Sequence, residues 1–166
     1  MQTLDDVITY LSSTPRTRAL TIERADLPPE PGLYLWFKND RDQPSYLGKA
    51  TGPKGIRSRI WSQHLNPNYL ETRQERWTKE DLPQAGCSVT KQGRPAIEKS
   101  AFRKALARKY GLVPGTPVVE FIRERYELIW IPLPELDGSA TREIEYGLIR
   151  KLIPILNRSG NPGRIR

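Results

Sequence analysis

The chain has 166 residues and a formal net charge of +8, from 27 Lys and Arg against 19 Asp and Glu. This length is typical of one domain. A hydrophobic content of 37%, with four Trp, excludes a disordered protein. One cysteine, Cys87, and one histidine exclude an internal disulfide and a zinc site. No apolar run approaches the roughly 20 residues of a membrane span, so we expect a cytoplasmic, intracellular protein without a membrane partner.

The first 30 residues are predicted to form a short helix and a loop. Apolar residues recur at helical spacing between residues 3 and 12, and Thr3 is the expected cap of this helix. Several prolines between residues 15 and 31 indicate irregular backbone. Residues 1–30 are therefore expected to be an extension that precedes the core of the domain.

A hairpin and a helix are predicted next. Residues 32–37 and 45–48 are rich in aromatic and aliphatic side chains, and the polar stretch 38–44 between them has the composition of a turn. Apolar residues at helical spacing then predict a helix over residues 56–65, which Asn66-Pro67 ends.

Residues 66–125 are predicted to be a basic helical insertion. The stretch 66–94 is polar and irregular, and an amphipathic helix is expected to begin near Ile97 and to end at Gly111. Between residues 91 and 109, seven basic side chains stand against one acidic side chain. Such a cluster attracts polyanions such as nucleic acid, although it is also typical of a solvated helix face.

A third strand, residues 126–133, and a last helix, residues 140–153, complete the predicted elements. Ser139 is expected to cap this helix and Pro154 to end it. The tail, residues 158–166, is basic and has no acidic residue. These elements predict an α/β (α+β) fold with a small antiparallel sheet, in a single domain over residues 1–166.

Glu145 is the most informative residue of the last helix. At about 100° per residue it falls near the middle of an apolar face, whereas Glu143 points to the polar side. A carboxylate among apolar side chains is costly unless it is paired or binds a metal ion. Three alternatives follow, namely a salt bridge to an arginine, a place at the edge of the apolar face, and a functional acid.

Four short motifs occur in an order that is known from one enzyme family. They are Gly32-Leu33-Tyr34, then Tyr46-Leu47-Gly48-Lys49-Ala50, then the helix with Arg59, and finally Glu145 followed by Asn157. Together they resemble the GIY-YIG endonuclease superfamily, and their wording is closest to the nuclease domain of the bacterial excision-repair incision subunit. The resemblance covers a core of residues 31–65 and 126–157.

The resemblance implies a three-stranded antiparallel sheet flanked by helices and a metal-dependent DNA endonuclease. Glu145 would bind one Mg²⁺ or Mn²⁺ ion, since a carboxylate completed by water suits these hard cations. Arg59 would hold the scissile phosphate through its guanidinium. Tyr34 and Tyr46 would position or deprotonate the attacking water, and either of them could take its proton.

Two more residues receive a catalytic role from the same resemblance. Lys49 would add a contact to phosphate, and Asn157 would orient the glutamate or the phosphate. Both lie inside the matching motifs, Lys49 directly after the second predicted strand and Asn157 after the last predicted helix.

The chain departs from the family pattern around the arginine helix. Arg59 follows Tyr46 by thirteen positions, which is longer than usual. The helical wheel places Arg57 nearer the middle of the apolar face, so Arg57 is a second candidate. Some members carry a histidine or tyrosine four residues after the arginine, where this chain has Gln63, and His64 follows one residue later. His64 is therefore either a packed or capping residue or a catalytic one.

DNA, double-stranded or branched, is the expected partner. Contacts to its phosphate backbone, which give affinity rather than sequence choice, are predicted for six residues, Lys49, Arg57, Lys99, Arg103, Lys104 and Arg158. One alternative is a nucleic-acid-binding module on the same fold with weak or no cleavage activity, and another is a basic structural protein of an RNA assembly. The role in repair or restriction and the oligomeric state stay open.

Overall fold

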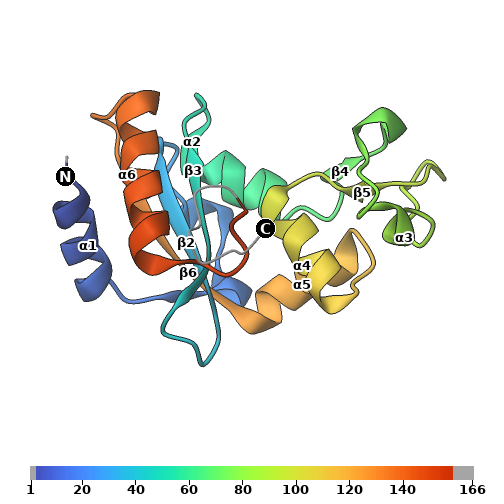
Figure 1. Ribbon diagram of the computed structural model, residues 1–166, viewed down its shortest axis with the longest axis horizontal. Helices are drawn as coiled ribbons and strands as arrows, with labels where there is room; N and C mark the ends of the chain where they lie inside the picture. The colour runs from blue at the N-terminus through green and yellow to red at the C-terminus, as the bar shows by residue number, and fades with distance from the viewer. Residues whose placement is uncertain (1–2, 159–166) are drawn as a thin grey trace.

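The computed structural model describes residues 3–158 (Figure 1). Its centre is an antiparallel sheet with the strand order β1-β6-β2-β3. The strands are β1 Thr17–Arg18, β2 Gly32–Lys38, β3 Pro44–Ala50 and β6 Tyr126–Pro132. The three longer strands confirm the three that the sequence predicts, to within two residues at each end, whereas β1 is not predicted.

Helices cover both faces of this sheet, which confirms a mixed α/β fold. On one face lie α1 Leu4–Ser13 and α6 Gly138–Leu152, and Figure 1 shows both on the side of the molecule away from the insertion. On the other face lie the helical stretch 55–64 and two helices of the insertion, whose apolar residues share one core with Trp36 of β2.

β2 is the most deeply buried strand, because it lies between two cores. Successive side chains of a strand point to opposite faces, so Leu33 and Leu35 pack toward α1 and α6 while Tyr34 and Trp36 pack toward the insertion. The same alternation on β3 places neighbouring motif residues on opposite faces of the sheet. Since β3 is the last strand of the sheet, both faces meet at its outer edge.

Residues next to their ends determine where the two helices on the first face, α1 and α6, begin and end. Thr3 caps α1 with a reciprocal bond to Asp6, as the sequence predicts. α6 begins at Gly138, two residues earlier than expected, and its cap is Asp137, so the prediction of Ser139 was wrong. Ile153 adopts a left-handed conformation directly after α6, and Pro154 follows it.

The helix predicted over residues 56–65 is present but has an unusual form. It consists of α2 Gly55–Arg57 and the π-helix η3 Ser58–His64. A π-helix joins residues five apart instead of four, and the backbone N–H of Leu65 accordingly donates to the carbonyl of Ile60 at 2.9 Å. This wider turn changes which side chains share a face of the helix.

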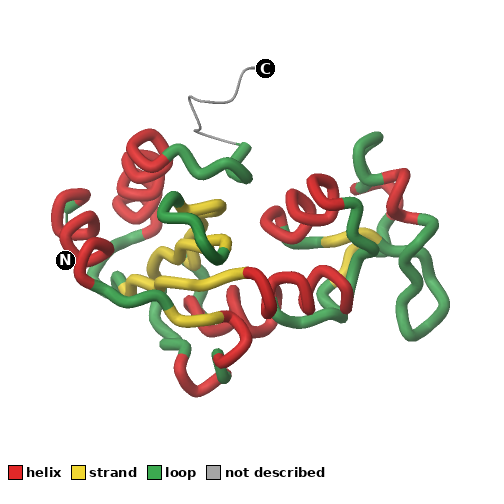
Figure 2. The backbone as a smooth tube through the Cα atoms, turned by 90° about the horizontal axis from the view of Figure 1, so that it is seen from below, coloured by secondary structure: helices red, strands yellow, loops and turns green. Residues whose placement is uncertain are grey.

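The insertion contains more regular structure than the sequence predicts. Its elements are β4 Leu70–Glu71, η4 Gln74–Arg76, α3 Leu82–Ala85, β5 Ile97–Glu98, α4 Ala101–Tyr110 and α5 Thr116–Arg125. The amphipathic helix therefore begins later than expected, since Ile97 belongs to a strand, and α5 is not predicted at all. Figure 2 shows α4 and α5 between the sheet and the other insertion elements.

The two ends of the chain differ in how much of them the structure describes. The loop over residues 1–30 contains two single turns, η1 Ala19–Thr21 and η2 Arg24–Asp26. Most of the predicted basic tail, residues 159–166, lies outside the described residues. Within residues 3–158, no helix is both long enough and apolar enough to cross a membrane.

Candidate active site at the edge of the sheet

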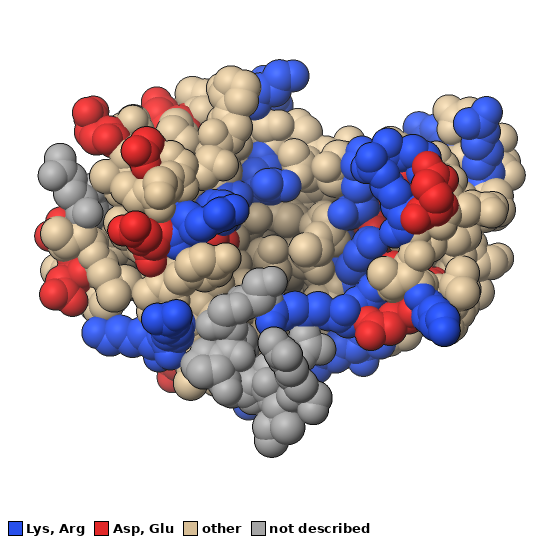
Figure 3. All heavy atoms as spheres, turned by 45° about the horizontal axis from the view of Figure 1, so that its top comes forward, with Lys and Arg blue, Asp and Glu red and all other residues tan. Residues whose placement is uncertain are grey.

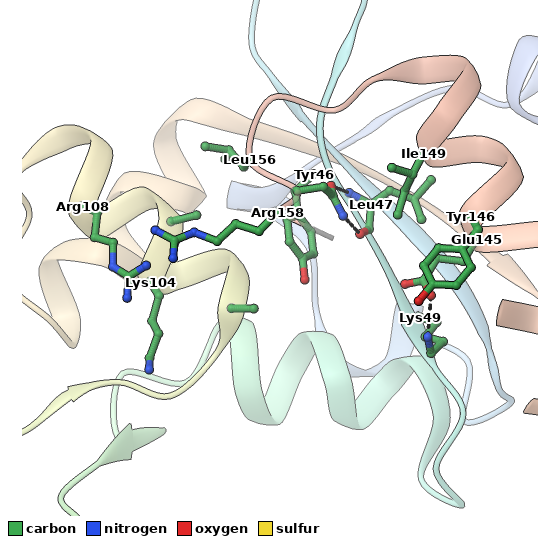
Figure 4. Close-up of a pocket in the computed structure, with 13 residues that line it drawn as sticks. Tyr46, Leu47, Lys49, Lys104, Arg108, Glu145, Tyr146, Ile149, Leu156 and Arg158 are labelled. Atoms are coloured by element: carbon green, nitrogen blue, oxygen red, sulfur yellow. Dashed lines mark hydrogen bonds and ion pairs between the residues drawn. The ribbon is translucent and has the colours of Figure 1, made fainter. Parts of the chain in front are cut away.

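A pocket of about 420 Å³ lies along the outer edge of β3 (Figure 4). The core of the domain supplies one wall, and α4 of the insertion supplies the other. Its ionisable lining includes Tyr46, Lys49 and Glu145 from the core, Lys104 and Arg108 from α4, and Arg158 after α6. With Asn157, which also lines it, the pocket thus joins four of the predicted catalytic residues to cations from the insertion.

Glu145 is paired with Lys49 inside this pocket. The Lys49 ammonium lies 2.5 Å from Glu145 Oε2, and only 9% of the Glu145 residue is exposed. The pairing explains how a carboxylate is tolerated on the apolar face of α6, because the opposite charge offsets its desolvation. Of the three alternatives, a salt bridge is therefore present, although its partner is a lysine of the hairpin and not an arginine.

Of the two tyrosines with a predicted catalytic role, Tyr46 is the one that lines the pocket. It lies on the opposite face of β3 from Lys49, and Figure 4 shows its ring between the core and α4. Burial raises the pKa of Tyr46 to about 12, although the nearby Arg59 guanidinium opposes this change. Tyr46 is therefore protonated at neutral pH and can donate a hydrogen bond.

Tyr34 is buried on the strand next to the one that carries Tyr46. Only 2% of this residue is exposed, and its ring lies against Gly48 on the neighbouring strand. A Cβ atom at position 48 would lie 2.4 Å from the Tyr34 hydroxyl oxygen, so only glycine leaves room for this ring. The glycine of the second motif is thus needed for packing of the tyrosine of the first.

His64 completes a buried chain of polar groups with Tyr34. Its Nε2 lies 2.8 Å from the Tyr34 hydroxyl, and its Nδ1 lies 2.8 Å from Ser100 Oγ at the start of α4. Gln63, at the position four residues after Arg59, instead accepts a bond from Arg59 at 2.6 Å. The π-helix turns the fifth residue, His64, toward Tyr34, which a pattern based on 3.6 residues per turn could not predict.

The only histidine of the chain predicts a simple pH effect on stability. Burial, with smaller contributions from Arg59 and Arg103, holds the pKa of His64 well below its ordinary value. The unfolded chain therefore takes up a proton below about pH 6.5 that the folded protein does not take up. The resulting loss of unfolding free energy, measured by urea denaturation, is expected to be about 2 kcal/mol between pH 7 and pH 5.

His64→Gln is the control for this effect, because glutamine does not titrate. The variant is less stable at every pH, since it loses part of the buried hydrogen bonding, but its stability should depend less on pH than that of the wild type. Equal pH dependence in the two proteins would contradict a neutral, buried His64.

The two candidate arginines lie in different places. Arg59 lines a hollow of about 230 Å³ next to the loop that follows β3, and its charge is close enough to act on Tyr34, Tyr46 and His64. Arg57 donates instead to the carbonyl of Leu27 at 2.7 Å and lines another hollow. Arg59 is therefore the better placed of the two for the candidate site.

Asn157 fixes the chain end to the edge of β3. Its amide nitrogen donates to the carbonyl of Leu47, and its amide oxygen accepts from the Leu47 N–H, both at 2.8 Å. The predicted role of Asn157 was to orient the glutamate or the phosphate. That role stays a prediction, and the bonds to Leu47 hold the segment that forms one end of the pocket.

The phosphate contacts predicted in and just before α4 separate into two groups. Lys104 lines the pocket and lies 3.4 Å from Asp81 Oδ2, and Lys99 is exposed beside the ring of Tyr69. The prediction for Arg103 was wrong, because this side chain is completely buried and its Nε lies 2.6 Å from Glu98 Oε2. The insertion wraps both sides of α4, and a helical wheel of α4 alone cannot detect this.

Sequence reasoning missed Arg108 as a residue of the pocket. It follows Lys104 by one helical turn and therefore shares a face of α4 with it. The spacing of four residues could therefore have predicted that Arg108 lies beside Lys104. Figure 3 shows the result at the surface, where Lys and Arg side chains lie on both sides of a hollow in this face of the molecule.

Comparisons with known proteins give no independent support for a function. No protein-family model matches the chain. Searches of curated proteins and of solved structures likewise found no match. The functional argument therefore depends on the geometry of the site and on the motifs.

Proposed function

We propose that this protein is a GIY-YIG-type endonuclease that hydrolyses phosphodiester bonds of DNA with one divalent metal ion. The observation that carries the proposal is the meeting of Glu145, Lys49 and Tyr46 in one pocket. Glu145 follows Lys49 by 96 residues, so the fold and not the local sequence brings them together. These are three of the residues to which the resemblance assigns a catalytic role.

The donor set of the pocket suits Mg²⁺ or Mn²⁺. The Lys49 ammonium already places a positive charge against Glu145 Oε2 and so stands in for such an ion. Over residues 3–158, no group of three or more His, Cys, Asp or Glu side chains is arranged to hold a metal ion. Glu145 would be the single carboxylate ligand, completed by water and phosphate oxygens as is usual for Mg²⁺. A bound ion supplies positive charge opposite the phosphate and acidifies water.

The side chains of the pocket divide the remaining work with Arg59, which lines a different hollow but whose charge acts on Tyr46 of the pocket. Lys49, once released from Glu145, and Arg59 would bind non-bridging oxygens of the phosphate. Tyr46 would position the attacking water by a hydrogen bond, since its pKa of about 12 keeps it protonated. The water oxygen forms a bond to phosphorus as the bond to the leaving sugar oxygen breaks, and that oxygen takes up a proton. Tyr34 and His64, which are buried, would hold Tyr46 in position from the interior of the protein.

The proposal is tested by incubating supercoiled plasmid with the protein and Mg²⁺ or Mn²⁺. We expect wild-type protein to nick the plasmid and Glu145→Gln to do so about a hundredfold more slowly, which is typical of losing one electrostatic contributor to a transition state. Arg59→Ala should be impaired to a similar degree, because the phosphate loses its guanidinium.

Glu143→Gln is the matched control, because it makes the same change on an exposed part of the same helix. Its cleavage rate should equal that of the wild type. Equal rates for the Glu143 and Glu145 variants would contradict the proposed site.

A second candidate function is a nucleic-acid-binding module with weak or no cleavage activity. The observation that favours it is the ion pair itself, since Lys49 already satisfies Glu145, the only carboxylate among residues 3–158 that lines the pocket. Wild-type protein that binds DNA but leaves plasmid intact over a range of metal ions and substrates would establish this alternative.

A further inference from the structure

One carboxylate bridges two arginines from distant parts of the chain. Glu80 lies between η4 and α3 of the insertion, and its Oε2 is 2.9 Å from Arg108 Nη1 and 2.5 Å from Arg158 Nη2. Arg108 belongs to α4, whereas Arg158 follows α6 and so belongs to the core side of the pocket. Glu80 is thus the link between the two walls at this end of the pocket.

We propose that Arg108 and Arg158 form a binding site for a backbone phosphate of nucleic acid, which Glu80 occupies in the free protein. The nature of the ligand rests on the proposed function, because the site adjoins the pocket that contains Glu145. A carboxylate and a phosphate present the same chemistry to a guanidinium, namely anionic oxygens that accept forked hydrogen bonds.

The environment of Arg108 shows why Glu80 can be replaced. Asp81 holds Arg108 independently, with its Oδ1 3.1 Å from Nε and 2.6 Å from Nη2. Asp81 is buried, whereas 59% of the Glu80 side chain is exposed. The guanidinium of Arg108 therefore keeps its orientation when Glu80 leaves, and an exposed ion pair contributes little to stability.

The position of the two arginines suits an extended polyanion. A second hollow of about 290 Å³ lies beside the main pocket, and both are lined by Arg108 and Arg158. Lys109 contributes a further cation to the second hollow. A nucleic-acid strand that passes from the main pocket into this hollow would place a phosphate between the two arginines, where Glu80 now lies. Figure 4 shows Arg158 reaching from the core side toward Arg108.

The test is a binding titration of a fluorescein-labelled DNA duplex, measured by anisotropy without metal ions. At about 0.1 M salt, Glu80→Gln is expected to bind the duplex about fivefold more tightly than the wild type, because two guanidiniums become available to phosphate. Arg158→Gln is expected to weaken binding.

Glu75→Gln is the matched control. It removes the same charge from an exposed position of the same insertion, and should change affinity by less than about twofold, since salt screens a distant charge. In the Arg158→Gln background the gain from Glu80→Gln should fall to the size of this control effect.

Three outcomes would overturn the inference. They are equal affinities of the Glu80 and Glu75 variants, a gain at Glu80 that persists without Arg158, and no binding of DNA by either wild type or Glu80→Gln. These results are independent of cleavage. A protein that binds DNA in the expected way but does not cut it would refute the proposed endonuclease and leave the phosphate site intact. If the protein cuts DNA normally but the Glu80 and Glu75 variants bind it equally well, the phosphate site is refuted and the endonuclease stands.

Discussion

Replacement of Arg103 by methionine is expected to lower the free energy of unfolding by about 3–5 kcal/mol, as is usual when one partner of a buried ion pair is removed. Methionine keeps most of the volume of the side chain, so the loss measures the charge and the hydrogen bonds of the guanidinium to the Gln63 and Asn66 carbonyls rather than a cavity. Neither Arg103 nor Glu98 has more than 1% of its side chain exposed. Without Arg103, Glu98 would be a buried carboxylate with a single remaining bond, from the Gly115 N–H at 2.7 Å.

The effect of Arg103→Met should depend on pH in a specific direction. Burial raises the pKa of Glu98, and Arg103 opposes this rise. Removal of Arg103 therefore raises the pKa of Glu98 further, so that the folded variant takes up a proton on acidification before the unfolded chain does. The difference in stability between variant and wild type should thus be larger at pH 7 than at pH 5, when both are measured by urea denaturation.

Lys109→Met is the control for this substitution. It replaces a cation with methionine on the same helix, but at an exposed position, and should cost less than about 0.5 kcal/mol, as is typical of surface changes. The double variant Glu98→Leu with Arg103→Met should recover much of the lost stability, because it leaves no unpaired charge. A loss below 1 kcal/mol for Arg103→Met alone would contradict the importance of the buried pair.

Arg103 also explains how the insertion and the candidate site are connected. Its Nη1 donates to the carbonyls of Gln63, at 2.8 Å, and Asn66, at 2.5 Å, where the π-helix ends. From the same region of the insertion, Ser100 bonds to His64. The insertion is therefore part of the support of the site and not only a carrier of positive charge.

The sequence predicted the parts of the fold that depend on short-range patterns. The long strands of the sheet follow from runs of aromatic and aliphatic residues between turn residues, and Thr3 was found because capping involves only the next three residues. α5 was missed because Pro117 and its β-branched residues lower helix propensity, while packing of Val118 and Ile122 against the core stabilises it.

Prediction of the site failed wherever long-range contacts decide the geometry. The position of Glu145 on an apolar face indicated a paired or functional carboxylate, but its partner Lys49 depends on how α6 crosses β3. In the same way, the burial of Arg103 depends on Glu98 and on the end of η3. The π-helix belongs to this group, since no residue type in its sequence specifies a turn of five residues.

Gly48→Ala is the other substitution with a large expected effect. The new Cβ would lie 2.4 Å from the hydroxyl oxygen and 2.5 Å from Cζ of Tyr34, and the phenol cannot swing into solvent because it is buried and bonded to His64. Overpacking of this kind costs about 3 kcal/mol of unfolding free energy. Urea denaturation measures the loss.

Gly52→Ala separates the clash from the general effect of removing a glycine. The two positions are four residues apart, and a Cβ at Gly52 meets no atom within 4 Å. Gly52→Ala should therefore change stability by no more than about 0.5 kcal/mol, partly through the lower entropy of the unfolded chain. If the two alanine variants were equally stable, the packing of Tyr34 on Gly48 would be refuted.

A double variant identifies the tyrosine as the group that Gly48 accommodates. Leucine at position 34 lacks the outer ring atoms and the hydroxyl, so in a Tyr34→Leu background the cost of Gly48→Ala should fall to that of Gly52→Ala. Such an interaction energy between two substitutions is expected only for residues in contact. It would tie the glycine of one motif to the tyrosine of the other through packing, which requires no catalytic role for Tyr34. Of the two candidate tyrosines, Tyr46 would then remain the one available to a substrate, since it lines the pocket with Glu145 and Tyr34 does not.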